Sequence, residues 1–218
     1  MIRALVLLAC CLATGASAAS FDCGKAASGT EKLICSDASV SALDEALNAA
    51  YKRAFERVGA RAVLRQSQRD WLSSYEVKGC SSAACLKDAF TARTELLADI
   101  AAPGEPGSAW SGEYQRLWRG KKDPNAAHLS MLGLKTGRVL IAGTALWQGP
   151  NASIGQVNTG DMSGIAAEQT AGKTLLFDGD GCTAQLQLDG DRITVTGESG
   201  CGGLNVTFDG QYRRIKQR

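Results

Sequence analysis

The chain has 218 residues, with 24 Lys and Arg against 22 Asp and Glu, so its formal net charge at pH 7 is only +2. This balance, with no basic stripe along the sequence, argues against a nucleic-acid-binding protein. Once a leader is removed, a chain of about 200 residues fits two small domains better than one.

The first 18 residues have the marks of a secretory signal peptide. Arg3 precedes a short apolar run over residues 4–13, and Ala16-Ser17-Ala18 gives the small-residue cleavage pattern. A membrane-spanning helix needs about 20 apolar residues, so this run is too short to cross a bilayer. We predict cleavage after Ala18 and a periplasmic or secreted mature chain with no integral membrane segment. A lipid-modified Cys10 is the alternative.

Six cysteines then remain, and an even number in an exported chain predicts disulfides. They are Cys23, Cys35, Cys80, Cys85, Cys182 and Cys201. The CxxC spacing of a zinc knuckle or a redox dithiol does not occur, and the lone His128 is far away in sequence. We therefore expect three disulfides, no metal and no cofactor.

Apolar residues up to about residue 100 recur at steps of three and four, which is typical of amphipathic helices. The longest such series is Val40, Leu43, Leu47, Tyr51, Ala54 and Val58. Ser28 with Glu31 predicts a capping box for a short first helix, and Asp37 predicts the N-cap of a second. A third helix is expected to end near Gly79, and a fourth to begin after Ser81 or Ser82. Short connections make neighbouring helices antiparallel, so a small bundle results.

Cys35 precedes the second predicted helix, Cys80 ends the third and Cys85 begins the fourth, so these three lie at one end of the bundle. Bridges Cys35–Cys80 and Cys23–Cys85 would tie that end together. The local pairing, Cys23–Cys35 with Cys80–Cys85, stays open, because bridged Cα atoms must come within about 7 Å and only the structure gives those distances. A bridge closing the 35–80 loop would add roughly 3–4 kcal/mol to a small core.

The segment from about 21 to 100 resembles the LprI-like family, named for a lipoprotein that inhibits lysozyme. The shared marks are Phe21-Asp22-Cys23, Glu31-Lys32-Leu33-Ile34-Cys35-Ser36-Asp37, Leu43-Asp44, Tyr51, Ser67-Gln68-Arg69-Asp70-Trp71-Leu72 and the Cys80, Cys85 close. The resemblance implies an envelope protein that binds and blocks lysozyme. The family usually has an Arg-Asp pair shortly after its Trp, where this chain has residues 73–76 with the sequence S-S-Y-E, so its binding surface is expected to differ there.

The polar residues beside the tryptophan suggest a binding site, but burial explains the pattern better. A Trp on the apolar face of a helix is usually part of the core, so we predict that Trp71 is buried. Gln68 and Arg69 are expected to face solvent or to cap a neighbouring helix.

The composition changes near residue 101, where helix formers give way to Gly, Thr and Val. The intervening sequence A-P-G-E-P-G-S predicts a linker over 102–109, between a helical domain at 19–101 and a β domain at 110–218. Strands are expected near 110–118, 128–134, 137–147, 153–158, 162–169, 173–178, 183–189, 192–197, 204–208 and 210–215. This spacing indicates an antiparallel barrel or sandwich, and the predicted fold class is a two-domain α + β protein.

The first and last of these strands look alike, as G-E-Y-Q-R at 112–116 and G-Q-Y-R-R at 210–214. Similar end strands would pair and close a barrel, which hides its edges, although a likeness over five residues also arises by chance. Cys182 and Cys201 flank a predicted hairpin, so a bridge between them is expected.

No catalytic motif accompanies these elements, and we predict that the protein is not an enzyme. His128 has no nucleophile at a recognisable spacing. Asp178 and Asp180 resemble the start of a calcium loop, but Cys182 and the missing twelfth-position Glu favour a hairpin turn.

Two functions therefore remain, a lysozyme inhibitor and an envelope module that binds glycan, lipid or another protein. The partner is then a lysozyme or a cell-wall component. Lysozyme works with two carboxyl groups in a cleft, and the cationic loop at 119–123 could reach them, although a solvated turn is the simpler interpretation. The residues that bind the partner are not identified by the sequence.

Overall fold

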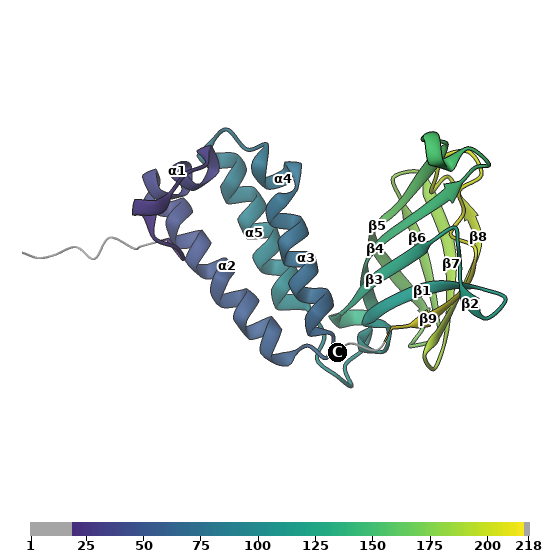
Figure 1. The fold of residues 1–218 in the computed structure, drawn as a ribbon. Helices are drawn as coiled ribbons and strands as arrows, with labels where there is room; N and C mark the ends of the chain where they lie inside the picture. Colours follow the sequence, from purple (N-terminus) through teal and green to yellow (C-terminus); the bar gives the residue numbers. More distant parts are fainter. Residues whose placement is uncertain (1–18, 216–218) are drawn as a thin grey trace, which may run out of the picture.

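The computed structural model describes residues 19–215, and the predicted leader lies outside the described residues. A helical region comes first and a closed antiparallel β-barrel follows beside it (Figure 1). This is the α + β arrangement that the sequence predicts. None of the helices described over 19–215 is long and apolar enough to cross a membrane.

Within residues 19–215 the helical region has five α-helices after a short 3-10 turn. They are η1 Cys23–Lys25, α1 Gly29–Ser36, α2 Ala38–Arg57, α3 Arg61–Ser73, α4 Tyr75–Lys78 and α5 Ala83–Asp99. The capping box of Ser28 and Glu31 is present, and Asp37 caps α2, as predicted. The third predicted helix is two helices, because the extended backbone of Ser74 (φ −69°, ψ 164°) separates α3 from α4.

The core of the helical region lies where α2, α3 and α5 meet. α2 packs closely along α5, while α3 stands apart from α2 (Figure 1). The fully buried side chains at the centre are Val40, Leu64, Leu86, Phe90 and Leu97. The same core continues onto the barrel through Leu132 and Leu134, which are 1% and 0% exposed.

The junction between the two regions is ordered. The Ala101 N–H donates to the Gly133 carbonyl at 2.9 Å, and Arg138 forms an ion pair with Asp99. Gly107 has φ +78°, and a Cβ there would lie 2.6 Å from the Leu134 carbonyl oxygen, so only glycine fits. The segment expected as a linker is therefore packed against the barrel as it passes between the two regions.

The disulfides join cysteines that are near in sequence. Cys23 pairs with Cys35 and Cys80 with Cys85, at Cα–Cα distances of 5.8 and 5.5 Å. This is the local pairing, and the cross-bundle bridges Cys35–Cys80 and Cys23–Cys85 are not formed. The reason is that η1 folds back onto the end of α1, while Cys85 lies in the first turn of α5, only 5 residues after Cys80. The expected bridge between Cys182 and Cys201 is present.

Eight strands close the barrel, and a ninth, short strand extends one of them into a hairpin. The strands are β1 Gly112–Trp118, β2 Lys121–Lys122, β3 Ala127–Leu134, β4 Arg138–Gln148, β5 Val157–Thr170, β6 Thr174–Gly179, β7 Cys182–Asp189, β8 Arg192–Ser199 and β9 Gly210–Arg214. Each of β3 to β8 pairs with the next strand in antiparallel fashion, β1 pairs with β2 and β3, and β1 also pairs with β9. The interior is filled by large side chains such as Leu129, Met131 and Phe177.

Three of the expected strands differ in the structure. The run at 162–169 is part of one long strand, β5, which already begins at Val157, because β4 pairs with it continuously from Gln148↔Val157 to Arg138↔Ala167. Most of the run at 153–158 is not a strand, because residues 152–154 form the 3-10 turn η4 Ala152–Ile154. The run at 204–208 is irregular instead. It belongs to the segment between β8 and β9 that crosses the end of the barrel, where the Gly203 N–H donates to the Thr159 carbonyl at 3.2 Å.

The pairing of the first and last strands confirms the closure that their likeness predicts. Tyr114 lies opposite Arg214, and Arg116 lies opposite Tyr212. Each tyrosine hydroxyl donates to a carbonyl four residues earlier, Tyr114 to Trp110 at 3.1 Å and Tyr212 to Phe208 at 2.7 Å. The repeated pattern is therefore aromatic-x-Gly-x-Tyr-x-Arg.

The two copies of this pattern accommodate each other across the seam. A Cβ on Gly210 would lie 2.9 Å from Cδ of Arg116, and one on Gly112 would lie 3.3 Å from Cδ of Arg214. Each glycine therefore leaves room for the arginine of the other strand. Arg214 Nε also donates to the Tyr114 hydroxyl at 2.9 Å. The pairing of β1 with β9 is thus reciprocal, and a shift of one strand by one residue would break both contacts.

Candidate functional site: a groove in the helical region and a cationic hairpin on the barrel

A groove of about 1450 Å³ lies in the helical region. Its walls come from α2 and α3, which diverge in Figure 1, and one end is closed by α1 and α4. Apolar side chains that line it are Phe21, Leu33, Ile34, Leu47, Tyr51, Leu72, Val77 and Phe90. Leu72 is 46% exposed and adds apolar surface to the α3 wall of the groove.

The carboxylates that line this groove are already engaged within the protein. The Glu31 carboxylate accepts hydrogen bonds from the Ala27 and Ser28 N–H groups, both at 2.8 Å, and these bonds lower the pKa of Glu31. The Asp44 carboxylate is buried and accepts from the Ser20 N–H at 2.7 Å. Asp44, one of the marks of the family resemblance, thus anchors the N-terminal segment.

The cations around the groove have no carboxylate partner among residues 19–215. Lys32, Arg65, Arg69 and Lys78 line it and are exposed. None of the four belongs to an ion pair in the described part of the chain. Arg65 lies over the Phe55 ring, 5.3 Å from its centroid, and Arg69 donates to the Gln66 side chain at 2.6 Å. The groove therefore combines an apolar floor with a cationic rim.

The S-Q-R-x-W run holds a buried arginine from α5. Trp71 is part of the core, as predicted. The prediction that Gln68 faces solvent is wrong, because it is 8% exposed and accepts a hydrogen bond from Arg93 Nε at 2.9 Å, whereas Arg69 is exposed. Arg93 also donates to Ser67 at 3.1 Å and lies over the Trp71 ring, 5.4 Å from its centroid.

Burial of Arg93 lowers its pKa to about 10, against the opposing effect of the Glu76 charge. Arg93 therefore stays charged at neutral pH, and its role is to fix α3 against α5 beneath the groove. Arg93 lies three residues after Phe90 and four before Leu97, and this helical spacing among apolar positions is a sequence signal for its inward orientation.

The loop at 119–123 that the sequence singles out is the tip of the β1–β2 hairpin. Trp118 is 58% exposed, and the Arg119 guanidinium lies 5.6 Å from its ring centroid. Lys121 and Lys122 are exposed, and Lys121 pairs directly with Trp118 across the hairpin. Asp123 differs from the other four, because it is buried and forms an ion pair with Arg116 at 2.8 Å.

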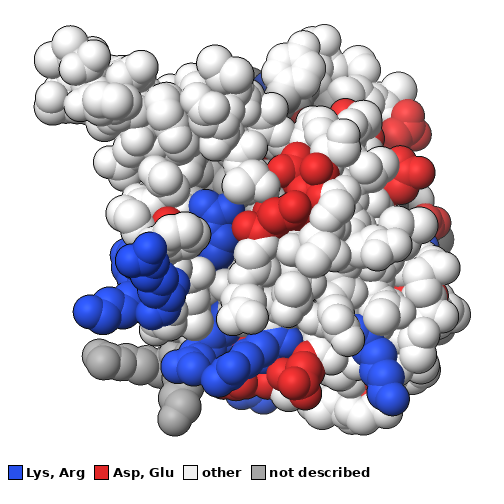
Figure 2. Space-filling view, turned by 90° about the vertical axis from the view of Figure 1, so that its right-hand side faces the viewer, with Lys and Arg blue, Asp and Glu red and all other residues white. Residues whose placement is uncertain are grey.

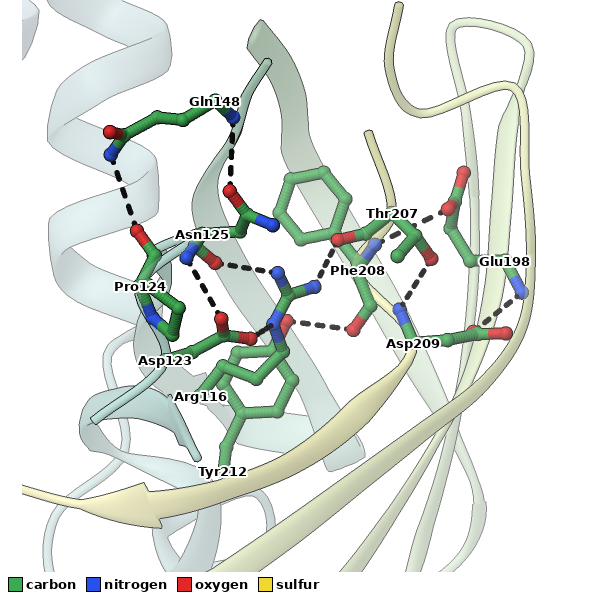
Figure 3. Close-up of polar contacts among 10 residues, drawn as sticks. All are labelled: Arg116, Asp123, Pro124, Asn125, Gln148, Glu198, Thr207, Phe208, Asp209 and Tyr212. Atoms are coloured by element: carbon green, nitrogen blue, oxygen red, sulfur yellow. Dashed lines mark hydrogen bonds and ion pairs between the residues drawn. The ribbon is translucent and has the colours of Figure 1, made fainter. Parts of the chain in front are cut away.

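Arg116 anchors the foot of this hairpin (Figure 3). Besides Asp123, its guanidinium donates to the Asn125 carbonyl at 2.7 Å and to the Thr207 carbonyl in the β8–β9 segment. Asp123 in turn accepts from the Asn125 N–H at 2.8 Å. Figure 3 shows that the network continues to Gln148 on one side and to Glu198 on the other. The hairpin is therefore held at its base from three other segments.

The remaining residues considered from the sequence take no part in a reactive cluster. His128 is partly exposed on the outside of β3, and burial and the Lys122 charge lower its pKa. Asp178 lies in β6 and Asp180 lies in the two-residue turn between β6 and β7, as the hairpin interpretation predicts. Among residues 19–215, no group of three His, Cys, Asp or Glu side chains could hold a metal ion.

Comparison with known families matches residues 23–117 to the family described as lysozyme inhibitor LprI. The match covers the whole helical region and runs to Leu117 in β1, one residue before the exposed Trp118. Searches of curated proteins and of solved structures give no match. The three disulfides and this family indicate a location outside the cytoplasm. The helical region with its groove, together with most of β1, is a lysozyme inhibitor LprI domain.

Proposed function

We propose that this protein is an exported, non-enzymatic inhibitor that binds lysozyme and blocks its cleft. The observation that carries the proposal is the match of residues 23–117 to an inhibitor family. The predicted leader and the three disulfides support release into the periplasm or the medium after cleavage behind Ala18.

The surface that we assign to lysozyme is the groove between α2 and α3. Its volume of about 1450 Å³ accommodates a protruding loop or helix of a partner rather than a small solute. The apolar floor supplies contact area, and Leu72 on the wall becomes buried only when a partner is seated. The rest of the helical region then covers the active-site cleft of the bound lysozyme and excludes the glycan substrate of that enzyme.

Charge favours the acidic part of the lysozyme surface. The four cations on the rim are unpaired with carboxylates in the described residues, whereas Glu31 and Asp44 are engaged within the protein. Rim cations near the two catalytic carboxyl groups of lysozyme gain Coulomb energy without losing an internal partner. Many lysozymes are basic overall, so we do not expect fast association driven by charge. The local attraction should instead set the orientation of the complex.

The test is a cell-wall lysis assay in which the mature protein is titrated into several lysozyme types. Leu72→Glu and Arg65→Glu place a charge in the groove wall and should raise the inhibitory concentration by about tenfold or more, as for truncation of a central contact residue. Arg53→Glu on α2 is the matched control, because Arg53 is exposed and does not line the groove. Its inhibition should equal that of the unchanged protein.

Two results would count against the proposal in different ways. Failure of the unchanged protein to inhibit any lysozyme type would remove the function itself. Equal inhibition by the Leu72→Glu, Arg65→Glu and Arg53→Glu variants would keep the function but move the contact surface away from the groove.

A further inference from the structure

We propose that the barrel carries a second binding site, for a carboxylate-bearing sugar of a glycan, between the β1–β2 hairpin and the β8–β9 segment. The site lies beyond the residues that match the inhibitor family, apart from Arg116 and Leu117 at its edge. It is independent of lysozyme inhibition, because its ligand is a glycan and not a protein.

The site is a pocket of about 380 Å³. Small-molecule sites range over about 300–1,000 Å³, so this volume suits one or two sugar units. The side chains and backbone that line it come from Arg116, Leu117, Trp118, Asp123, Pro124, Asn125, Thr207, Asp209 and Gly210. An aromatic ring, a proline and several hydrogen-bonding groups thus meet in one place, which is the mixture that a sugar with its apolar ring face and polar rim requires.

Trp118 supplies the stacking surface. Its side chain is 58% exposed although it is the largest residue type, and nothing in the barrel core requires an indole at this position. Arg119 lies over the ring at 5.6 Å and restrains its orientation. A sugar ring that stacks on Trp118 removes apolar surface from water at little cost in side-chain entropy.

The cations beside Trp118 indicate that the sugar carries a negative charge. Residues 118–122 contain Arg119, Lys121 and Lys122 and no acid. None of the three forms an ion pair among residues 19–215, since the nearby Asp123 is buried and paired with Arg116. Lys121 is the direct cross-strand partner of Trp118, so its ammonium flanks the stacking surface. A carboxylate on the sugar ring or its substituent is the complementary group.

Polar groups in the pocket favour a glycan over a phosphate-rich ligand. Asn125 uses its Oδ1 to accept from the Gln148 N–H at 2.9 Å, which leaves its amide Nδ2 for a ligand. Asp209 uses its Oδ1 to accept from the Glu198 N–H at 3.0 Å, which leaves Oδ2 as an acceptor for sugar hydroxyl groups. A phosphodiester has no hydroxyl donor for this oxygen, whereas a sugar ring has several.

The hairpin is preorganised for binding. Arg116 and Asp123, with side chains 7% and 9% exposed, join the two sides of its base and tie it to the β8–β9 segment. Little ordering entropy is then lost when a ligand enters. Charges are also unevenly distributed over the barrel face in Figure 2, where most Lys and Arg lie in the lower half and most Asp and Glu in the upper right.

The test uses the full mature protein and two tetrasaccharides of the same β-1,4-linked backbone. One alternates N-acetylglucosamine with N-acetylmuramic acid and carries carboxylates, whereas chitotetraose carries none. We expect calorimetric binding of the carboxylated sugar with tryptophan fluorescence changes, and weaker binding of chitotetraose. Trp118→Ala should weaken binding by about tenfold or more. Lys121→Gln should weaken it by about two- to fivefold.

The matched control is Lys173→Gln, which removes an equally exposed cation from the turn between β5 and β6 at the other end of the barrel. Its affinity should equal that of the unchanged protein. Absence of binding to the carboxylated sugar overturns the proposal, and so does unchanged binding by Trp118→Ala. Equal affinity for both sugars overturns the assignment of the carboxylate. Binding to vesicles of anionic phospholipid in place of either sugar would assign the hairpin to a membrane surface and overturn the glycan site.

Discussion

The helical region and the barrel each bury one arginine, but they support its charge differently. Arg93 in the helical region is 7% exposed, and its guanidinium contacts the Ser67 and Gln68 side chains and the Trp71 ring. Arg116 in the barrel is 6% exposed and has the Asp123 carboxylate with two backbone carbonyls. No described residue forms an ion pair with Arg93.

The difference follows from how each region is closed. The groove keeps one side of the helical core near solvent, so an arginine below it needs only neutral hydrogen-bond acceptors and an aromatic face. The barrel is sealed by its paired end strands, and a charge at the seam needs a counter-charge. We therefore expect the two regions to respond very differently when a buried polar partner is removed.

The largest effect is expected from Asp123→Ala. This substitution leaves Arg116 charged, buried and without its carboxylate, and removing one partner of a buried ion pair costs about 3–5 kcal/mol. It also removes the acceptor of the Asn125 N–H. The free energy of unfolding from denaturant titration, followed by near-UV circular dichroism, measures the loss.

Two variants control for this interpretation. The double variant Arg116→Met with Asp123→Leu removes both charges and should recover most of the lost stability. Lys87→Ala breaks the partly exposed pair with Asp37 and should cost at most about 1 kcal/mol. A loss for Asp123→Ala no larger than that for Lys87→Ala would show that the seam does not depend on its ion pair.

The disulfides of the two regions should also contribute unequally. Cys182–Cys201 spans 19 residues and Cys80–Cys85 only 5. The loss of entropy in the unfolded chain predicts that the bridge closing the longer loop stabilises the fold by about 3 kcal/mol and the other by about 2 kcal/mol. Paired Cys→Ala variants of each bridge, compared by thermal and denaturant unfolding, test this order. A larger loss from the Cys80–Cys85 pair would mean that the local bridge supports the bundle beyond its own turn.

Replacing the helical arginine should cost less than breaking the barrel pair. Arg93→Met keeps the length of the side chain and ends the burial of a charge, but it leaves the Gln68 amide oxygen without its donor. The expected loss is about 1–2 kcal/mol. Adding Gln68→Leu to Arg93→Met should reduce the loss, since both polar partners are then gone. A loss of 3 kcal/mol or more for Arg93→Met, comparable with the expectation for Asp123→Ala, would contradict the contrast between the regions.

The sequence predicts those features that depend on local pattern. The capping box at Ser28, the N-cap at Asp37 and the burial of Trp71 all follow from helical spacing and short-range hydrogen bonds. The closure of the barrel follows from two similar end strands, because residues that occupy equivalent places in a seam share the same requirements. Alternation along β1 also puts Arg116 on the inner face with Tyr114, a signal that sequence analysis alone had not used.

The features that the sequence does not predict depend on contacts between distant segments. Cysteine spacing does not distinguish the Cys23–Cys35 bridge from one across the bundle. The groove exists because α3 leans away from α2, and the Gln68–Arg93 hydrogen bond and the Trp71–Phe90 ring contact join α3 to α5 instead. The length of β5 depends on its partner β4 rather than on its own turn residues.

The smallest effect concerns His128, the single histidine of the chain. Burial, then the Lys122 charge, lowers its pKa from the ordinary 6.5, and Glu113 opposes this. The unfolded chain therefore binds more protons than the folded one in this range. The neutral imidazole stabilises the fold fully above pH 6.5, and this contribution falls as the pH drops through the lowered pKa. His128→Gln should flatten the dependence of unfolding free energy on pH between about 5 and 7.

Nuclear magnetic resonance titration of the lone imidazole measures the same shift directly. Lys122→Gln should raise the imidazole pKa toward its ordinary value, because it removes the nearby cation and leaves burial unchanged. Lys173→Gln, at the opposite end of the barrel, should leave the titration unaltered and serves as the control. The effect is small because His128 lies on the outer face of β3, where solvent screens the charges of Lys122 and Glu113. An imidazole pKa at or above 6.5 in the unchanged protein would contradict the predicted lowering, since the outer face of the barrel would then favour the charged form of His128.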